Sequence, residues 1–138
     1  MSVRETLNKE KCPFCEQSQE SFVDANNHAF VIRDAFPVTQ LHTLVIPNRH
    51  IAGYFDLYDY EVIALHELLT IQQNAIRAVD PSVTGFNIGI NCGVDSGQTI
   101  FHCHIHLIPR RKGDVTNPRG GVRHMFPGKG DYLSTRSD

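Results

Sequence analysis

A short segment in the second half of the chain, in which three histidines alternate with apolar or small residues, constrains the fold most strongly. It spans residues 100–109, and its histidines are His102, His104 and His106. Because successive side chains of a β-strand point to opposite faces, a strand here would place the three imidazoles on one face, about 7 Å apart. The intervening residues would share the other face and pack into a core; they are Cys103, Ile105 and Leu107. We therefore predict a strand over 100–109 with one chemical face and one buried face.

Three other apolar runs have the length and the boundaries of strands. Residues 28–33 and 41–46 are bounded by turn-forming residues and are close enough in sequence to pair antiparallel. Residues 84–91 form a third run, and a turn over 93–97 leads from it to the histidine segment. Strands joined by short connections predict a mainly antiparallel sheet.

The chain between residues 57 and 79 carries the helical signal. Apolar residues recur there at steps of three and four and would line one face. This predicted face consists of Tyr58, Val62, Leu65, Leu69, Ile76 and Val79. We expect Asp56 to cap the start of the helix and Asp80-Pro81 to end it. One long helix and a mainly antiparallel sheet together predict an α+β domain.

Composition and charge exclude several classes of partner. Hydrophobic residues make up 41% of the chain, enough for a core, and the formal net charge of −2 argues against a general affinity for nucleic acid. No apolar run approaches the roughly 20 residues that span a bilayer. The charged start, residues 1–5, lacks the apolar core of a signal peptide. We therefore expect a cytoplasmic protein that binds neither nucleic acid nor membrane.

Two kinds of chemistry fit the histidine row. Histidines two apart on a strand can share a catalytic zinc, but such a site needs a third ligand and usually a general base. No H-x-H-x-D or H-E-x-x-H pattern is present. Alternatively, the middle imidazole attacks a phosphorus atom while its other ring N–H is held to fix the tautomer. Three solvated histidines on an exposed face are a further alternative, which the period-two spacing disfavours.

The run from His102 to Ile108 resembles the H-φ-H-φ-H-φ-φ signature of the histidine triad (HIT) family of nucleotide hydrolases and transferases. Residues 85–99 resemble the strand and turn that lead into the triad, and residues 34–47 resemble the upstream nucleotide-pocket segment. The sequence Pro-Arg-Arg-Lys-Gly-Asp at 109–114 resembles the stretch that follows the triad in diadenosine-polyphosphate hydrolases. The similarity covers about residues 10–114, and we expect 115–138 to be an irregular C-terminal arm of the same single domain.

The resemblance implies catalytic roles for four residues. His104 is implied as the nucleophile that forms a covalent nucleotidyl intermediate. His106 is implied to hydrogen-bond the phosphate and to assist the leaving oxygen. Thr99 matches a position whose hydroxyl contacts the phosphate or the leaving group. His42 matches a family histidine near the triad, although a buried core histidine is the alternative.

Other matched positions are implied to bind the nucleotide. Asp34 would accept hydrogen bonds from the ribose hydroxyls, although an Asp here is equally explained as the start of a turn. Ile32 and Phe36 would flank the base by apolar contact. Asn91 matches a polar position near the phosphate, with a backbone-bonding strand end as its alternative. Gln98 joins Thr99, His104 and His106 in this expected nucleotide-binding set.

The C-x-x-C pair near the N-terminus has metal-ligand spacing. Related zinc-containing members of the family combine such a pair with two histidines, one of them the first of the triad. The resemblance therefore implies a structural zinc, and its ligands would be Cys12, Cys15, His50 and His102. A redox pair is an alternative, but the thioredoxin-like context is missing. An unmetallated pair, with His102 hydrogen-bonded instead, is another.

Two cysteines and a basic cluster lie outside these motifs. We read Cys92 and Cys103 as small buried hydrophobes. The cluster Arg110-Arg111-Lys112 favours a small anionic ligand and would meet the distal phosphates of a polyphosphate. A solvated basic loop is the alternative for these three residues.

The resemblance also implies a fold and an activity. The family fold is an α+β sheet of about five strands with one long and one short helix, and members pair into a homodimer with a continuous ten-stranded sheet. The implied activity is cleavage at the α-phosphate of a nucleotide conjugate, with an Ap4A-type dinucleoside polyphosphate as the favoured substrate. A nucleoside 5′-phosphoramidase and a nucleotide-binding protein without turnover are the alternatives. No organic cofactor is expected, and a divalent ion would enter only with a polyphosphate substrate.

Overall fold

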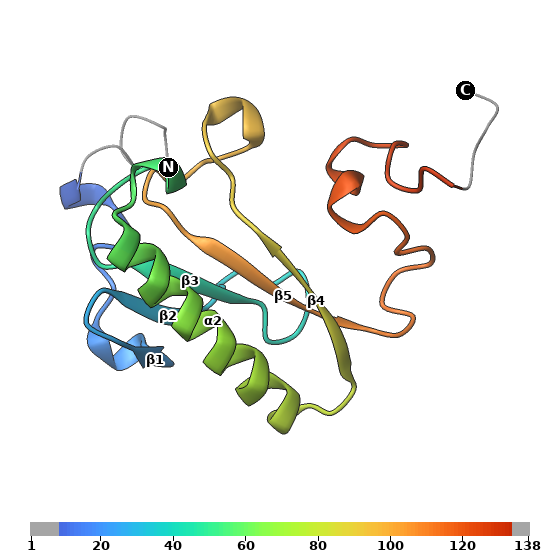
Figure 1. Cartoon of the computed structure of the whole chain (residues 1–138), viewed down its shortest axis with the longest axis horizontal. Coiled ribbons are helices and arrows are strands. Elements are labelled where there is room, and N and C mark those ends of the chain that lie inside the picture. Colours follow the sequence, from blue (N-terminus) through green and yellow to red (C-terminus); the bar gives the residue numbers. More distant parts are fainter. Residues whose placement is uncertain (1–8, 134–138) are drawn as a thin grey trace.

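A five-stranded antiparallel sheet forms the centre of the computed structural model, which describes residues 9–133 (Figure 1). Its strand order is β1-β2-β3-β5-β4. The strands are β1 (Asp24–Ala25), β2 (Ala29–Arg33), β3 (Thr43–Pro47), β4 (Val83–Gly89) and β5 (Ile105–Arg111). The long helix α2 (Asp59–Val79) lies across one face of the sheet. This arrangement confirms the predicted α+β fold.

The remaining regular elements within residues 9–133 are short 3-10 helices. They are η1 (Lys9–Lys11), η2 (Gln19–Ser21), η3 (Tyr54–Asp56), η4 (Val94–Ser96) and η5 (Gly121–Met125). The expected short second helix is thus not an α-helix anywhere within residues 9–133. In the same stretch, no helix combines the length and apolar character needed to cross a membrane. The charged residues 1–5, on which the expected location partly rested, lie outside the described residues.

Alternating side chains of β2 and β3 contribute to two apolar clusters on opposite faces of the sheet. The cluster under α2 contains Ala29, Val31, Val45, Ala64, Leu65, Leu68 and Ile105. The cluster on the other face contains Cys12, Phe14, Phe30, Ile32, Leu44 and Ile46. Because both faces of these strands are covered, the strands read as continuous apolar runs. The second cluster holds the N-terminal segment against the sheet.

The start of α2 differs from the sequence-based prediction. Tyr58, not Asp56, is the N-cap residue, and its backbone N–H donates to the Glu61 carboxylate at 2.8 Å. The same carboxylate accepts from Arg49, also at 2.8 Å. Asp56 was therefore wrong as the cap, because Glu61 supplies the acceptor from within the first turn.

The inner face of α2 is also shifted from the predicted one. Leu65 and Ile76 are buried as predicted, whereas Tyr58 and Val79 are 53% and 75% exposed. The buried residues of the helix are Glu61, Ala64, Leu65, Leu68, Gln72 and Ile76. Polar residues occupy two of these positions because each has a partner: Glu61 binds Arg49, and Gln72 accepts from Arg33 at 2.9 Å. Apolar periodicity alone could not find them.

The histidine segment is only partly a strand. Because β5 begins at Ile105, His102 and His104 precede it in irregular backbone, and the predicted strand over 100–109 was wrong in its first half. In this irregular stretch the His102 ring bonds to the backbone carbonyl of Pro47, and the His104 ring bonds to the backbone carbonyl of His102. The predicted core positions are nevertheless all buried; they are Cys103, Ile105 and Leu107.

The arm after β5 forms a self-contained loop beside β4, in red in Figure 1. Within it, Asn117 Nδ2 donates to Asp131 at 2.9 Å and Arg123 Nε donates to the Gly130 carbonyl at 3.2 Å. Gly120 has a φ of 90°, and a Cβ there would collide with the backbone of Gly130. The crossing therefore requires glycine, and the arm keeps a defined shape although η5 is its sole regular element among the described residues.

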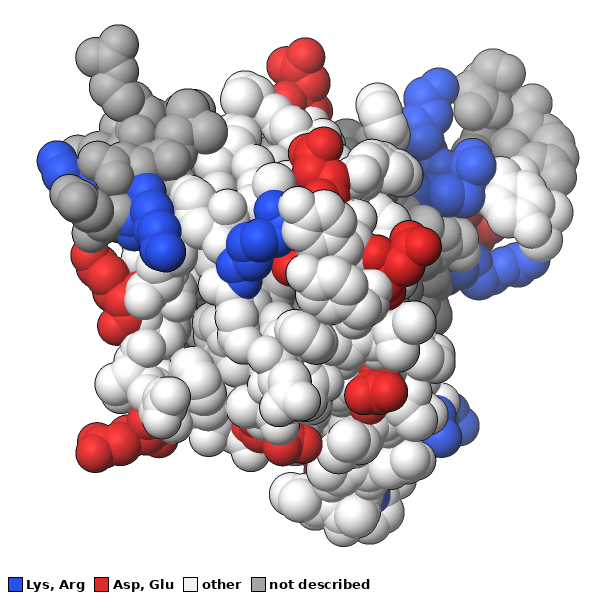
Figure 2. Space-filling view, turned by 60° about the vertical axis from the view of Figure 1, so that its left-hand side comes forward, with Lys and Arg blue, Asp and Glu red and all other residues white. Residues whose placement is uncertain are grey.

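Charged side chains do not gather in one patch on the face drawn in Figure 2. Acidic and basic residues there surround a broad uncharged area. This distribution agrees with the small net charge of the chain, −2.

Candidate functional site

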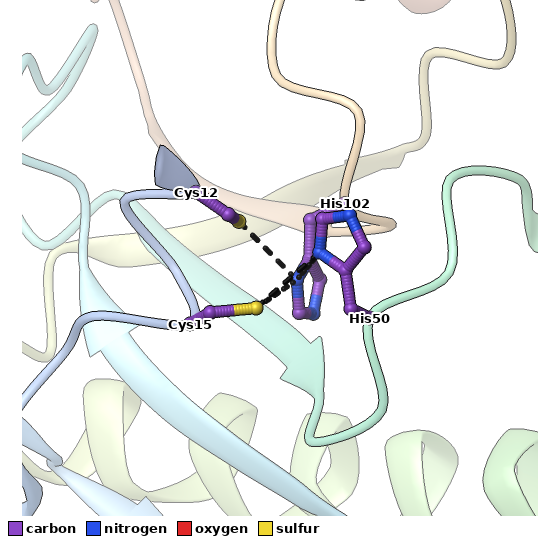
Figure 3. Close-up of side chains that lie close together, drawn as sticks. All are labelled: Cys12, Cys15, His50 and His102. Carbon is purple, nitrogen blue, oxygen red and sulfur yellow. Dashed lines mark hydrogen bonds between the residues drawn. The ribbon is translucent and has the colours of Figure 1, made fainter. Parts of the chain in front are cut away.

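Two cysteines and two histidines converge where the N-terminal segment meets the sheet (Figure 3). They are Cys12, Cys15, His50 and His102. Cys15 Sγ lies 3.3 Å from His50 Nδ1 and 3.5 Å from His102 Nδ1, and the two Nδ1 atoms are 3.2 Å apart. Cys12 Sγ is also 3.5 Å from His102 Nδ1. Tetrahedral zinc ligands with bonds of about 2.0 to 2.3 Å are separated by about 3.3 to 3.8 Å, so the cluster has the spacing that zinc requires.

A hydrogen bond at Nε2 orients the His102 ring so that Nδ1 can bind a metal. Its Nε2–H donates to the Pro47 carbonyl at 2.7 Å, which leaves a lone pair on Nδ1. Burial lowers the pKa of His102 to about 4, so the ring is neutral at pH 7. Burial, with a contribution from Cys12, raises the pKa of the Cys15 thiol to about 11. A cation between the sulfurs would reverse this effect and favour thiolates. The four residues therefore fit a closed structural zinc site.

His104 lines a cavity, and within residues 9–133 only its Nδ1 has a hydrogen-bond partner. Its Nδ1–H donates to the backbone carbonyl of His102 at 2.8 Å, so the lone pair of the neutral ring is on Nε2. The side chain is 9% exposed, and burial lowers its pKa. The Phe14 ring packs edge-on against it at 5.0 Å between centroids. An oriented, neutral imidazole is the form in which histidine acts as a nucleophile.

A chain of hydrogen bonds fixes the tautomer of His106. The Val38 backbone N–H donates to His42 Nδ1 at 3.1 Å, so neutral His42 carries its proton on Nε2. That N–H points at His106 Nδ1, 2.9 Å away, and leaves the His106 proton on Nε2. Burial lowers the pKa of both rings, that of His106 to about 4. His106 is thus a neutral hydrogen-bond donor whose ring centroid lies 5.1 Å from that of His104.

A cavity of about 520 Å³ opens in front of these rings. The sequence-predicted residues that line it are Ile32, Asp34, Asn91, Thr99, His104 and His106, together with Phe36. Asp34 Oδ1 accepts the Phe36 N–H at 2.8 Å, and Oδ2 lies 3.4 Å from His42 Nε2. Asp34 therefore starts a turn, as one interpretation predicted, and it also lines the cavity, where contact with a ribose stays a prediction.

The family model described as the HIT domain matches residues 16–113 of this chain, which include all three histidines of the row. The chain belongs to the HIT domain family. A 16.1 kDa HIT-like protein of Mycoplasma pneumoniae is 36% identical over 119 residues, covering 80% of this chain and 78% of that protein. The zinc-bound histidine triad family protein of Mycobacterium smegmatis superposes with a TM-score of 0.70 at 31% identity, covering 80% of this chain and 82% of that one. The resemblance seen in the sequence is therefore confirmed.

The similar proteins include a named enzyme. The asymmetrical bis(5′-nucleosyl)-tetraphosphatase of Schizosaccharomyces pombe is 42% identical over 80 residues. These residues are 58% of this chain and 43% of that enzyme.

One residue assigned to the nucleotide, Gln98, has backbone groups as its hydrogen-bond partners. Gln98 is buried, and its Oε1 accepts the Gly93 N–H at 2.8 Å. Its Nε2 donates to the carbonyls of Ala52 and Ile100 at 2.9 and 3.1 Å. Because the amide bonds to the backbone and Gln98 does not line the cavity, these contacts do not support its expected role at the nucleotide, which stays a prediction. Gln98 shapes the loop before the triad.

Two of the basic residues that follow the triad, Arg110 and Arg111, form ion pairs outside this cavity. Arg110 donates to Asp114 at 2.8 and 2.9 Å and to Asn87 at 2.6 Å. Arg111 donates to Asp80 at 2.9 and 3.0 Å. Neither arginine lines the cavity with His104, so the expected contact with distal phosphates is not supported for them. Their guanidinium groups join β5 to the neighbouring elements.

Two further features correct or extend the sequence analysis. Cys92 is exposed, contrary to expectation, because β4 ends at Gly89 and the chain then turns outward, whereas Cys103 is buried as expected. Sequence reasoning missed that Pro13 and Phe14 line the cavity. A signal was present, since the two residues lie between the C-x-x-C cysteines, which the resemblance places beside the first histidine of the triad.

Proposed function

We propose that this HIT protein is a nucleotide hydrolase or transferase that cleaves at the α-phosphate of a nucleotide conjugate through a nucleotidyl-His104 intermediate. One observation carries the proposal. The neutral His104 ring carries its lone pair on Nε2, because its Nδ1–H donates to the His102 carbonyl at 2.8 Å. The ring also lines a cavity of about 520 Å³. Asp34, Asn91 and Thr99 line the same cavity as candidate contacts to ribose and phosphate.

The proposed reaction has two displacements at the same phosphorus atom. In the first, the Nε2 lone pair of His104 bonds to the α-phosphorus while the bond to the leaving oxygen breaks. The resulting positive charge on the ring is stabilised by its Nδ1–H bond to the His102 carbonyl. His106 Nε2–H donates to the phosphate or leaving oxygen as negative charge develops there. In the second, water attacks the phosphorus, the P–N bond breaks, and a proton is released to solvent.

We favour an Ap4A-type dinucleoside polyphosphate as the substrate. His106 is neutral, and loss of its remaining N–H proton would leave an unfavourable anion, so it serves as a hydrogen-bond donor and not as a strong acid. A departing polyphosphate needs no proton at neutral pH, whereas the amine of a phosphoramidate must be protonated. The name of the Schizosaccharomyces pombe relative supports the same choice. A nucleoside 5′-phosphoramidase and a nucleotide-binding protein without turnover are the alternatives.

Three structural parts complete the proposal. Cys12, Cys15, His50 and His102 would hold a structural zinc, which the zinc-bound relative from Mycobacterium smegmatis supports. The chain would form a homodimer through β4, which is an edge strand of the sheet and carries a 54% exposed Ile88. Residues 10–114 would form the HIT core and 115–138 its arm, of which 134–138 lie outside the described residues.

Trapping the intermediate tests the proposed chemistry. We expect brief incubation with a slowly hydrolysed dinucleoside tetraphosphate analogue, followed by alkaline quenching, to leave a nucleoside monophosphate on the protein. Peptide mass spectrometry should place it on His104, since Nε2 is the bare nitrogen at the cavity wall. The variant His66→Ala, which changes an exposed histidine on α2, should give the same adduct. Nucleotide binding without any adduct or product would contradict the proposal and favour the binding-protein alternative, and parallel assays with a phosphoramidate would rank the two substrate classes.

The proposed ribose contact gives a second prediction. Asp34→Asn keeps an acceptor for the Phe36 N–H but removes the negative charge. A hydrogen bond from a hydroxyl to a charged acceptor is worth about 1.5 to 3 kcal/mol, so we expect KM for a ribonucleotide substrate to rise about tenfold with kcat nearly unchanged. The 2′-deoxy substrate should lose much less. Equal losses for both substrates, measured by steady-state kinetics, would show that Asp34 does not contact the ribose.

A further inference from the structure

The outer face of β4 and β5, the face opposite α2, continues beyond the catalytic cavity. In the antiparallel register His106 lies opposite Gly89, Ile108 opposite Asn87, and Arg110 opposite Gly85. Residues directly opposite each other share a face, and alternate residues on each strand do so as well. The face that carries His106 therefore runs on to Ile108, about 7 Å further along the strand.

A second cavity, of about 370 Å³, lies on this continuation. Its floor includes Ile108, Arg110, Asn87 and Gly89. Gly89 is the residue opposite His106, and a Cβ placed there would meet no atom within 4 Å. At Gly89, beside His106, no side chain therefore rises from the sheet between the second cavity and the catalytic one.

Two segments form the walls of the second cavity. The connection between β2 and β3 contributes Val38 and Thr39, and Thr39 Oγ1 donates to the Pro109 carbonyl at 2.9 Å. Val38 is also the residue whose N–H orients His42, so this wall adjoins the triad. The C-terminal arm contributes apolar side chains to the other wall; they are Val115, Val122 and Met125.

We propose that this second cavity binds the nucleoside of the leaving half of a dinucleoside polyphosphate, which makes the C-terminal arm a determinant of substrate specificity. The inference rests on the proposed function, and it assigns the other end of the same substrate. The cavity lies on the same face of the sheet as His106, further along β5 toward Arg110. Its volume is within the range of small-molecule sites, roughly 300 to 1,000 Å³. Aliphatic and Met side chains with a few polar groups at one edge suit a planar base. The polyphosphate would pass over Gly89, where no side chain obstructs it.

Paired arm variants of the full chain test this assignment. The double variant Val122→Ala/Met125→Ala removes two wall side chains, and the matched control Phe126→Ala/Leu133→Ala removes two exposed apolar side chains of the arm that do not line the cavity. Diadenosine tetraphosphate is compared with adenosine 5′-tetraphosphate, which lacks the second nucleoside. Because partial loss of apolar contact weakens binding by about tenfold, we expect KM for the dinucleoside to rise about tenfold in the first variant. Its kcat/KM for adenosine 5′-tetraphosphate should stay within about twofold of the unmodified chain, and the control should change neither substrate.

The outcomes separate this inference from the proposed function. Trapping of the His104 adduct is followed in all proteins with both substrates. If the adduct forms but the two variants treat the dinucleoside alike, or the first variant loses both substrates equally, the second cavity does not bind the leaving nucleoside. If no adduct forms with either substrate in the unmodified chain, the proposed chemistry itself fails. An unmodified chain that prefers the dinucleoside, with the preference lost only in the cavity variant, supports the assignment.

Discussion

Replacement of His104 by alanine should abolish turnover while leaving nucleotide binding largely intact. The variant loses the bare Nε2 that would bond to phosphorus, and no other ring at the cavity wall offers one, since the described hydrogen bonds leave a proton on His106 Nε2. Loss of a nucleophile typically lowers kcat by about 10⁴-fold or more. The Kd for a nucleoside monophosphate should change by less than about threefold, because the proposed ribose and base contacts are with other residues that line the cavity.

The measurements are single-turnover kinetics with a dinucleoside polyphosphate and nucleotide affinity by calorimetry. His66→Ala is the control, because His66 is exposed on α2 and its loss removes a histidine without touching the cavity. A His104→Ala protein that retains more than about one hundredth of the kcat would show that water attacks directly. A variant that also loses nucleotide affinity would show that the ring serves binding and not bond formation.

The residues whose chemistry depends on close sequence spacing were predictable. The C-x-x-C spacing singled out Cys12 and Cys15, and the resemblance to zinc-containing family members added His50 and His102. The structure brings the possible ligand atoms of all four within 4.8 Å of one another. The apolar alternation also placed Ile105 and Leu107 in the core correctly. The cysteine pair and the buried positions follow from local geometry, because neighbouring positions on one segment must occupy related directions.

Contacts that join distant segments could not be predicted from sequence spacing. The partners of the Gln98 amide are an example: they are Gly93, Ala52 and Ile100, of which Ala52 is 46 residues earlier in the chain. The tautomer of His106 depends on His42, 64 residues earlier in the chain. Local spacing does not specify which loop carbonyl or ring will meet a given side chain, so these partners became visible only in the fold.

Removal of the proposed zinc from the cluster of Cys12, Cys15, His50 and His102 should destabilise the whole domain. The cluster joins the N-terminal segment to the chain just after β3 and to the triad segment. A structural zinc contributes its binding free energy to folding, so we expect Cys15→Ser, or treatment with a strong chelator, to lower Tm by more than about 10 °C. Cys92→Ser is the matched control, since Cys92 is exposed, and its Tm should be unchanged. Metal analysis of the unmodified chain should give close to one zinc per chain.

Metal loss should also lower activity, although His104 would not be a ligand. His102 would bind the metal through Nδ1, while its backbone carbonyl accepts His104 Nδ1–H at 2.8 Å. A displaced His102 would therefore release the hydrogen bond that keeps the His104 lone pair on Nε2. At a temperature where the chelated protein is still folded by circular dichroism, we expect kcat to fall at least about tenfold and to recover when zinc is restored. A metal analysis that finds no zinc in the unmodified chain would show that the cluster is an unmetallated pair, with His102 hydrogen-bonded to Pro47. Unchanged Tm and unchanged kcat after complete removal of bound zinc would show that the metal supports neither folding nor catalysis.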